Sequence, residues 1–289
     1  MEILKSVIDQ SINFINWQPD NGAFEARYVR RSDDYFIVYL SSHTGCKMAC
    51  RMCHLTQTGQ TMMRNSTLAD FIDQAKPVLD HYRTQPVADK VHFNFMARGE
   101  PLANPNILNS WNWVATGLQG SAELAGLKNY AFNISTIIPE QVCDVKLSKA
   151  FSEPHTALYY SLYSMRPEFR RKWLPRALEP TLALDKLVEW QQVHQRPVAL
   201  HWTFIEGEND DMGTLEEIAE AVTSRDLIVK FNTVRYNPYS ERQGKEPPEE
   251  IVQRNFDFLS EVFGGESNRI VPRIGIDCAA SCGVFVTPE

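Results

Sequence analysis

Three of the six cysteines fall within one short run, Cys46-Lys47-Met48-Ala49-Cys50-Arg51-Met52-Cys53. The spacing C-x3-C-x2-C lets a single loop place three thiolates around an iron–sulfur cluster, for which thiolate is the suitable soft ligand. Three protein ligands leave one iron of a cubane 4Fe-4S cluster free to bind a small chelating molecule. His43 and His54 lie close to the same run, so a zinc site is the second interpretation. Disulfides fit short secreted scaffolds and do not fit a chain of this length.

A second segment with ligand-binding potential is Met96-Ala97-Arg98-Gly99-Glu100-Pro101-Leu102, which follows an expected strand. Glu100 offers a carboxylate, and Gly99 lets the backbone approach a ligand closely because it carries no side chain. Gly and Pro also end strands in many loops, so an ordinary turn is the alternative interpretation of this segment taken alone.

The elements that must position these residues alternate between strand and helix after the cysteines. Expected strands lie at 91–96, 130–135, 157–162, 198–205, 227–236 and 269–276, and expected helices at 68–79, 105–114, 139–150, 181–192, 214–223 and 248–263. Repeated strand–helix units imply parallel strands with right-handed crossovers. About six units are fewer than the eight of a closed barrel. We therefore predict an α/β fold, a partial (β/α)6 TIM-like barrel with its chemistry at the carboxyl ends of the strands.

The residues before the cysteines form a short extension in this prediction. The first 22 residues suggest a helix followed by a turn through Trp17-Gln18-Pro19-Asp20-Asn21-Gly22. Segments 24–29 and 35–41 then suggest a β-hairpin that leads into the cysteine loop. The expected division is an N-terminal helix and hairpin over 1–41 and a barrel with a C-terminal cysteine segment over 42–289.

Composition favours a single large globular domain, since 43% of the 289 residues are hydrophobic and 22% are charged. We find neither a charged-then-apolar N-terminal pattern nor an apolar run near 18 residues, so we expect no secretion and no membrane insertion. The cysteine usage indicates a reducing compartment, hence a cytoplasmic protein, which we expect to be a monomer. The net charge of −7 argues weakly against a nucleic-acid partner, because local basic patches decide such binding. Basic residues after the strand at 157–162 either contact phosphates or form an ordinary solvated helix face: Arg166, Arg170, Arg171, Lys172 and Arg176.

The cysteine spacing together with Gly99-Glu100-Pro101 resembles the radical SAM (S-adenosylmethionine) enzymes, whose fold is a partial barrel. This resemblance implies that Cys46, Cys50 and Cys53 hold a 4Fe-4S cluster whose open iron is chelated by SAM. It also implies that Gly99 and Glu100 hold the SAM amino group. The reduced cluster splits SAM into methionine and a 5′-deoxyadenosyl radical, so an electron donor such as flavodoxin or ferredoxin is implied as well.

Further motifs over about residues 24–286 resemble the RlmN/Cfr-type RNA methyltransferases, which act on an adenine ring carbon. The resemblance implies that Glu25 is a proton acceptor. It also implies that residues at the strand ends bind SAM: Ser135, Ser161, Leu162, Tyr163 (a histidine in the family) and Asn237. We expect the chain to be without the N-terminal accessory domain that longer members of the family carry. An adenine of rRNA or tRNA is the implied substrate.

The run Gly275-Ile276-Asp277-Cys278-Ala279-Ala280-Ser281-Cys282-Gly283 resembles the family's G-x-D-x-x-A-x-C-G. Cys282 then corresponds to the cysteine that accepts a methyl group from SAM and carries it to the adenine. The second, resolving cysteine of the family corresponds to Tyr39, and a phenol cannot form a disulfide. Three outcomes stay open: Cys278 takes the resolving role, the final step differs, or SAM serves other radical chemistry on a nucleotide, peptide or small molecule. The alternative outside the enzymes is a binding protein that a metal ion stabilises and that catalyses no reaction.

Overall fold

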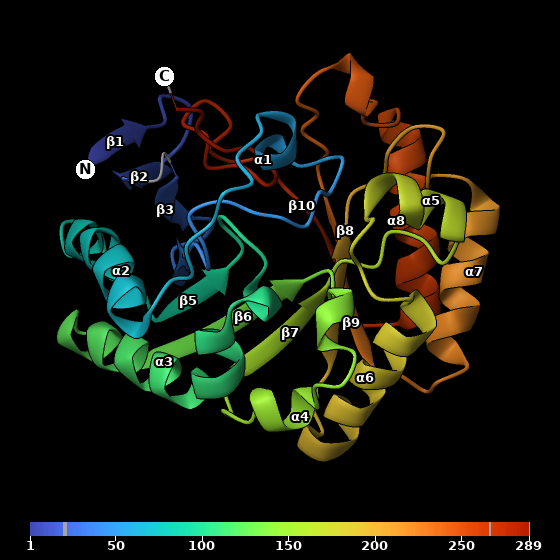
Figure 1. Cartoon of the computed structure of the whole chain (residues 1–289), viewed down its shortest axis with the longest axis horizontal. Helices are drawn as coiled ribbons and strands as arrows, with labels where there is room; N and C mark the ends of the chain where they lie inside the picture. The colour runs from blue at the N-terminus through green and yellow to red at the C-terminus, as the bar shows by residue number, and fades with distance from the viewer. Residues whose placement is uncertain (20–21, 266, 289) are drawn as a thin grey trace.

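A computed structural model of the chain describes residues 1–19, 22–265 and 267–288. Its strands form one sheet in sequence order, and from β4 onward each neighbouring pair is parallel (Figure 1). The first three pairings, from β1 to β4, are antiparallel. The strands are β1 Glu2–Lys5, β2 Ile12–Trp17, β3 Ala23–Arg30, β4 Tyr35–Tyr39, β5 Lys90–Phe95, β6 Asn129–Thr136, β7 Thr156–Tyr160, β8 Val198–Trp202, β9 Val229–Val234 and β10 Arg269–Val271.

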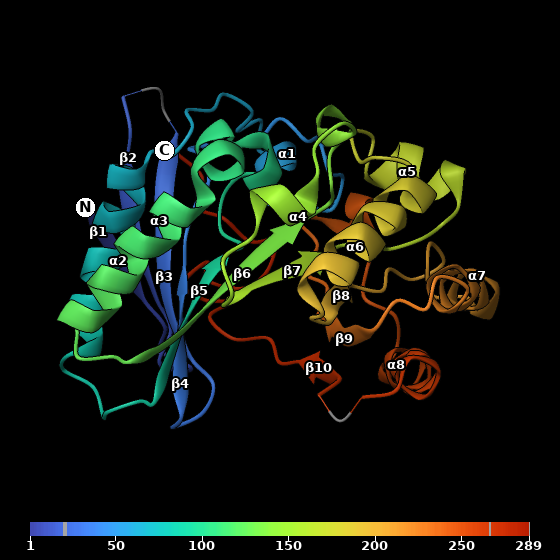
Figure 2. The same ribbon diagram turned by 90° about the horizontal axis from the view of Figure 1, so that it is seen from below.

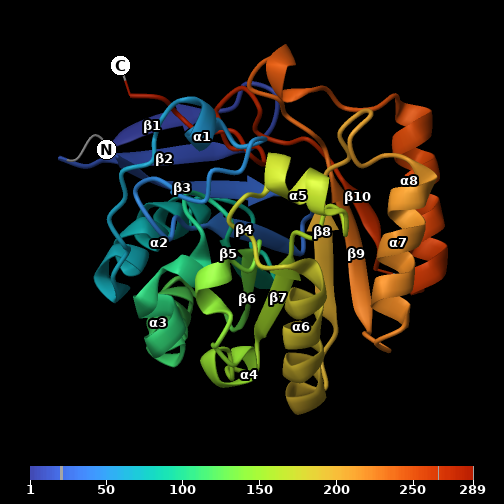
Figure 3. The ribbon, with the colours of Figure 1, turned by 45° about the vertical axis from the view of Figure 1, so that its right-hand side comes forward.

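Helices cover the outer face of the curved sheet in an arc from α2 and α3 to α7 and α8 (Figures 1, 2 and 3). Their bounds are α1 His54–Gln57, α2 Leu68–Tyr82, α3 Pro105–Leu124, α4 Leu147–Ala150, α5 Pro167–Trp173, α6 Pro180–His194, α7 Met212–Thr223 and α8 Glu249–Phe263. This is the partial barrel that the sequence predicts, with a β extension at the N-terminus. The strand expected at 269–276 is the short β10, and β4, expected only in the hairpin, is the first parallel strand of the barrel. No helix of the described residues has the length and apolarity needed to cross a membrane.

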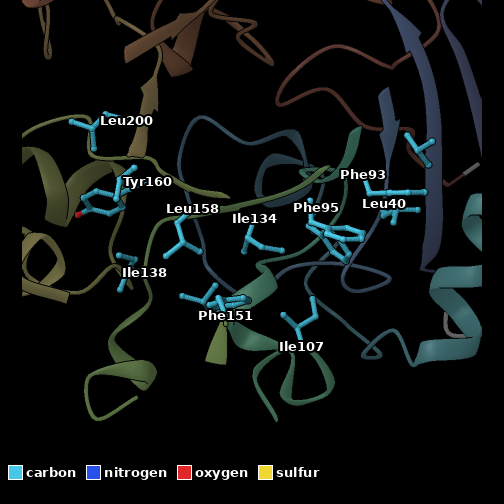
Figure 4. Close-up of a cluster of buried hydrophobic side chains, with 14 of the residues drawn as sticks. Leu40, Phe93, Phe95, Ile107, Ile134, Ile138, Phe151, Leu158, Tyr160 and Leu200 are labelled. Carbon is cyan, nitrogen blue, oxygen red and sulfur yellow. The ribbon is translucent and has the colours of Figure 1, made fainter. Parts of the chain in front are cut away.

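The two faces of the barrel strands differ in polarity because successive side chains of a strand point to opposite faces. Phe93 of β5, Ile134 of β6 and Leu158 of β7 point outward and pack with Ile107 and Phe151 in a buried apolar layer under the helices (Figure 4). The alternate positions of the same strands carry polar side chains, which line a cavity inside the barrel: His92, Asn94, Asn133, Ser135 and Tyr159. The apolar outer layer holds the helices, and the polar inner face remains available for binding.

Helix α2 shows how local signals fix an element that precedes the site. The Thr67 side chain accepts a hydrogen bond from the backbone N–H of Asp70, and the Asp70 carboxylate accepts one from the Thr67 N–H. This capping box satisfies backbone donors at the start of the helix. Phe71, Ala75 and Val78 follow a helical period and are fully buried. The helix predicted over 68–79 is confirmed.

Two of the expected helices are wrong. The segment expected as the first helix contains strands β1 and β2, because β2 pairs with β3 and buries Ile12 and Phe14 in the core, a long-range gain that outweighs local preference. Residues 20 and 21 of the expected turn lie outside the described residues. The segment 139–150 contains only a 3-10 turn, Glu140–Val142, and the short α4. Its start is held instead by a β-bridge between Pro139 and Ala177. The division at residue 41 stays a prediction, since β4 pairs with strands on both sides of it.

Candidate active site

A cavity of about 230 Å³ lies inside the barrel and reaches the carboxyl ends of the strands. Cys46, Cys50 and Cys53 line it, and so does Cys282 from the segment after β10. The two motifs are in direct contact, because the backbone N–H of His54 donates to the carbonyl of Gly283 over 3.2 Å. Figures 1 and 3 show this C-terminal segment beside the loop that leads to α1. The fold therefore brings together residues more than half the chain apart.

The cysteine loop is held in a tight conformation by its backbone. A Cβ atom on Gly45 would lie 2.2 Å from the carbonyl oxygen of Met62 and 2.7 Å from that of Gln60, so only glycine fits there. The N–H of Cys46 donates to the same Gln60 carbonyl over 3.0 Å. Ala49 adopts a positive φ of 56° between the first two cysteines. These constraints direct the three thiols toward the cavity.

The environment of the three thiols fits an iron–sulfur cluster. Burial, together with the neighbouring thiols, raises the pKa of Cys46 to about 12 and that of Cys50 well above its ordinary value. Burial also raises the pKa of Cys53 to about 11. Buried thiolates need a compensating positive charge, which bound metal supplies. The apolar side chains of Met48 and Trp173 pack close by and keep water away from this end of the cavity.

The two histidines considered for a zinc site do not line the cavity that the three cysteines line, and each makes a hydrogen bond through one ring nitrogen. His43 Nδ1 lies 2.9 Å from Ser42 Oγ, and His54 Nε2 lies 3.1 Å from the carbonyl oxygen of Asn237. No group of three or more His, Cys, Asp or Glu side chains in the described part of the chain is arranged to hold a single metal ion. Thiols spread around a shared cavity suit a cluster of several atoms better than one ion.

Gly99 and Glu100 form a carboxylate site at the cysteine end of the cavity. Gly99 has a φ of +93°, and a Cβ atom there would lie 2.5 Å from both Ser42 Oγ and His43 Nδ1. The Glu100 carboxylate accepts hydrogen bonds from the N–H groups of Leu102, over 3.0 Å, and Ile137, over 3.1 Å. Burial raises its pKa to about 7. A buried carboxylate without a cationic side chain beside it can accept an ammonium group from a ligand.

Some of the expected strand-end residues line the cavity, and others are buried behind its wall. Ser135, Ser161 and Tyr163 line the cavity, and Ser135 Oγ lies 3.0 Å from His201 Nε2. Leu162 is fully buried in the apolar core, where its carbonyl accepts a hydrogen bond from an arginine, so its side chain does not reach the cavity.

Asn237 holds the C-terminal segment. Its Nδ2 donates to the carbonyl of Cys282 over 2.9 Å and to Ser281 Oγ over 3.2 Å. Its Oδ1 accepts a hydrogen bond from Arg273 Nε over 2.7 Å. A smaller cavity beside the main one is lined by Asn237, Tyr163 and Cys282. Asn237 therefore fixes the position of the Cys282 backbone.

Glu25 lies outside the cavity, in a buried ion-pair network. Its carboxylate accepts hydrogen bonds from Arg98 Nε (2.7 Å), Arg27 Nη2 (2.9 Å), Asn13 Nδ2 (2.8 Å) and the N–H of Val286 (3.2 Å). Burial acts to raise the pKa of Glu25, but the charges of Arg27 and Arg98 outweigh it and hold the pKa below its ordinary value. A carboxylate with all these partners acts as an anchor for the C-terminal segment. Its role as a proton acceptor stays a prediction.

The two C-terminal cysteines have different surroundings. Cys278 is buried, with its Sγ 3.6 Å from the carbonyl of Gly275 and 3.8 Å from that of Ser11, and it does not line the cavity. Cys282 does line it. This residue is solvent-accessible at the cavity wall. Desolvation within the cavity raises the pKa of Cys282, and the charges of Arg27 and Arg31 act in the opposite direction. For Cys278 to act as the resolving thiol, this segment would have to rearrange.

The basic run after β7 is largely used within the protein. Arg166 pairs with Asp211 and Glu217, and Lys172 pairs with Glu208. Arg170 is buried and donates to the carbonyls of two leucines. Few of these cations are therefore free to contact phosphates.

Sequence reasoning did not identify the polar residues on the inner face of the barrel. Tyr159, His201 and Asn232 line the cavity from β7, β8 and β9, and Arg31 and Arg269 line it near β3 and β10. The first three could have been found from the sequence, because polar residues stand at alternate positions in strands that are otherwise apolar. The arginines gave no such signal, since each stands at the end of its strand.

A partial barrel with three cysteines in the loop after the first parallel strand, and a buried Gly-Glu segment after the second, defines the radical SAM class. No family model matches the chain. A "Probable RNA methyltransferase" of Rhodopseudomonas palustris is 27% identical over 276 residues, covering 91% of this chain and 68% of that protein. Another "Probable RNA methyltransferase", from Thiobacillus denitrificans, is 33% identical over 205 residues, covering 69% of this chain and 51% of that protein. A "Probable dual-specificity RNA methyltransferase RlmN" of Caldicellulosiruptor saccharolyticus is 26% identical over 277 residues, with 95% and 75% covered.

Among solved structures, a radical SAM methyltransferase from Sphaerobacter thermophilus superimposes with a TM-score of 0.81. The match covers 98% of this chain and 80% of that one at 20% identity, which shows a common fold. The chain is an RlmN/Cfr-like radical SAM enzyme. It spans between about half and three quarters of the length of these curated relatives.

Proposed function

We propose that this chain methylates an adenine ring carbon in RNA, with Cys282 as the methyl carrier. The observation that carries the proposal is the shared cavity, which is lined by Cys282 and by all three cysteines of the N-terminal motif. Radical chemistry requires the group that generates the radical and the group that receives it to be enclosed together. The names of the relatives supply the RNA substrate class.

The residues that would hold the cofactors follow from their place in the cavity. Cys46, Cys50 and Cys53 would hold a 4Fe-4S cluster, which when reduced supplies the electron that cleaves SAM. Gly99 and Glu100 would bind the SAM amino group. The rest of SAM would contact side chains at the strand ends: Ser135, Ser161, Tyr163 and Asn237. Leu162, buried in the core, would support this end of the cavity without touching SAM. The electron donor would be of the flavodoxin or ferredoxin type.

Cys282 must lose its proton before its sulfur can accept a methyl group. Desolvation disfavours the thiolate, and the guanidinium groups of Arg27 and Arg31 favour it. Arg27 is also a structural partner of this segment, since its Nη1 donates to the Ser281 carbonyl over 3.1 Å. The same side chain thus positions Cys282 and helps to ionise it.

Mass spectrometry of the protein, purified without oxygen after expression with SAM available, tests the carrier role. We expect S-methylcysteine at Cys282 and an unmodified thiol at Cys278. The Cys278→Ala variant should keep the modification, and Cys282→Ala should lose it. An unmethylated Cys282 in the wild-type protein would overturn the proposal. Incubation with methyl-labelled SAM and separate rRNA and tRNA pools, followed by nucleoside analysis, then identifies the RNA and the base.

Tyr39 favours a second candidate function, non-methylating radical chemistry on a nucleotide, peptide or small molecule. Tyr39 lines the cavity at the position of the family's resolving cysteine. Release of 5′-deoxyadenosine from SAM without any methyl group on Cys282 would support this candidate over methylation.

A further inference from the structure

One part of the cavity carries positive charge that the protein does not neutralise. Arg31 and Arg269 both line the cavity. Among the described residues, no carboxylate oxygen lies within 4.0 Å of either guanidinium. The other arginines of the cavity wall are paired: Arg27 with Glu25, Arg235 with Glu249 and Arg273 with Glu246. Two cations are therefore left to act on whatever occupies the cavity.

Both of these arginines also hold a buried N–H group without an acceptor. The Nε atoms of Arg31 and Arg269 are inaccessible to solvent and have no hydrogen-bond partner. Their other contacts are with phenols, from Arg31 Nη2 to the Tyr39 hydroxyl over 3.1 Å and from Arg269 Nη1 to the Tyr35 hydroxyl over 3.4 Å. Leaving a charged donor buried and unsatisfied is costly, and in this conformation the Nε atoms are closed to a ligand. An anion in the cavity would therefore meet the Nη groups of these two arginines, whose charge no carboxylate offsets.

The part of the cavity lined by Arg31 and Arg269 is positively charged, whereas the part lined by the three cysteines carries a carboxylate. Glu100 is the sole carboxylate among the described lining residues, and its charge is close enough to influence Cys46 and Cys50. At the other end, burial and nearby cations, among them Arg269 and Arg31, lower the pKa of His92 to about 4. The positive charge is therefore concentrated on the guanidinium groups around a neutral histidine.

The inner face of the barrel also provides a buried acceptor suited to a nucleobase. Asn232 lines the cavity, and its Oδ1 is buried without a hydrogen-bond partner. The neighbouring amides are satisfied by each other, since Asn133 Nδ2 donates to Asn94 Oδ1 over 2.7 Å. An amide oxygen can accept a hydrogen bond from the exocyclic amino group of adenine.

We propose that Arg31 and Arg269 bind a phosphate group of the substrate nucleotide, inside the barrel and within reach of Cys282. This inference rests on the proposed function and specifies its substrate as a nucleotide held by its phosphate. A guanidinium offers a planar pair of donors that matches phosphate oxygens, and two of them match its charge. Arg31 and Cys282 line the same cavity, and the charge of Arg31 acts to lower the pKa of the Cys282 thiol. The site is separate from that proposed for SAM, which carries no phosphate.

Calorimetric binding of AMP and adenosine to the anaerobically purified protein, with SAM at saturation, tests the phosphate site. We expect AMP to bind about tenfold more tightly than adenosine or better, because charge-assisted hydrogen bonds form only with the phosphate. Equal affinity for AMP and adenosine, together with RNA binding that does not depend on Arg31 and Arg269, would overturn the inference. This comparison uses wild-type protein and does not depend on any variant folding correctly.

Single variants then assign the preference to the two arginines. Arg31→Gln and Arg269→Gln should each reduce AMP affinity toward that of adenosine and leave adenosine binding unchanged. Arg225→Gln is the matched control, because Arg225 pairs with Asp185 and does not line the cavity. Wild-type affinity for AMP in both cavity variants would contradict the assignment.

A short adenine-containing RNA distinguishes the two sources of the phosphate. If the RNA binds more tightly than adenosine, and the arginine variants lose this difference, the site binds a phosphodiester. If AMP binds more tightly than adenosine but the RNA does not, the site binds a free nucleotide. Either result supports the phosphate site, and the absence of both differences overturns it. Methylation of Cys282 is read separately by mass spectrometry, so failure of the proposed function and failure of this site are distinguishable.

Discussion

Arg98 Nε donates a hydrogen bond to Oε1 of Glu25 over 2.7 Å, and both side chains are completely excluded from solvent. Arg98 and Arg27, which both pair with Glu25, also bind the C-terminal segment. Arg27 Nη2 donates to the carbonyl of Val284 and Arg98 Nη2 to that of Val286, each over 2.7 Å. The network joins β3, the loop after β5 and the segment that carries Cys282.

Replacement of Glu25 by glutamine should destabilise the protein and release its C-terminal segment. The change leaves two buried guanidiniums without their counter-ion, which typically costs about 3–5 kcal/mol. Urea unfolding measures the loss, and limited proteolysis should show faster cleavage after β10. The exposed Asp80 pairs with Lys76 and Arg83, so Asp80→Asn should change stability by less than about 1 kcal/mol. Equal stability of the two variants would contradict a structural role for Glu25.

Glu100 should make the cluster-free protein less stable as pH rises. Its pKa in the folded chain is about 7, above the ordinary value of 4.5, so folding favours the protonated carboxyl. Stability contributed by this group is therefore complete below pH 4.5, falls between 4.5 and 7 and stays low above 7, by roughly 3 kcal/mol in all.

The measurement is the difference in unfolding free energy between wild type and Glu100→Gln from pH 4 to 8. The difference is needed because His43, His92 and His201 have pKa values lowered to about 4 and contribute stability that rises with pH in the same range. Wild type should lose stability relative to the variant as pH increases. A difference that does not vary with pH would show that Glu100 ionises normally.

The parts of the site that could be predicted from the sequence are those set by local constraints. The cysteine spacing and Gly99-Glu100 identify the cofactor end of the cavity, because each is a short motif whose chemistry does not depend on distant residues. Strands β1 and β2 could not be predicted, since β2 is stabilised by pairing with β3 and β1 by pairing with β2. Arg31 and Arg269 line the same cavity because of the curvature of the whole sheet, and no local sequence pattern indicates this.

Gly99→Ala should be much more destabilising than the same change at Gly126. Both glycines have a positive φ, +93° and +86°, so alanine is strained at each. A Cβ atom at Gly126 would have no neighbour within 4 Å, whereas at Gly99 it would lie 2.5 Å from Ser42 Oγ and His43 Nδ1. We expect an additional loss of about 1–3 kcal/mol at Gly99 from this overlap, measured by urea unfolding. The Gly99→Ala protein should also bind SAM more weakly. Equal losses at the two positions would mean that the turn adjusts freely.

Asn237→Asp should displace Cys282 without removing any cysteine. The Asn237 Nδ2 donor to the Cys282 carbonyl becomes a carboxylate oxygen, which repels that carbonyl, while the acceptor for Arg273 is kept. An unsatisfied buried carbonyl costs about 1–3 kcal/mol, and this partly buried one should cost about 1 kcal/mol. We expect that loss in urea unfolding, and a lower methylated fraction of Cys282 at unchanged iron content.

Asn129→Asp is the matched control for this change, since the exposed Asn129 Nδ2 donates to the carbonyl of Asp89 over 3.1 Å. Water replaces the lost hydrogen bond at that exposed position, so stability and methylation should both stay close to wild type. Full methylation of Cys282 in the Asn237→Asp protein would show that the hydrogen bond from Asn237 does not position the methyl carrier. A parallel loss of iron would instead assign Asn237 to the stability of the cysteine loop, which it contacts through His54.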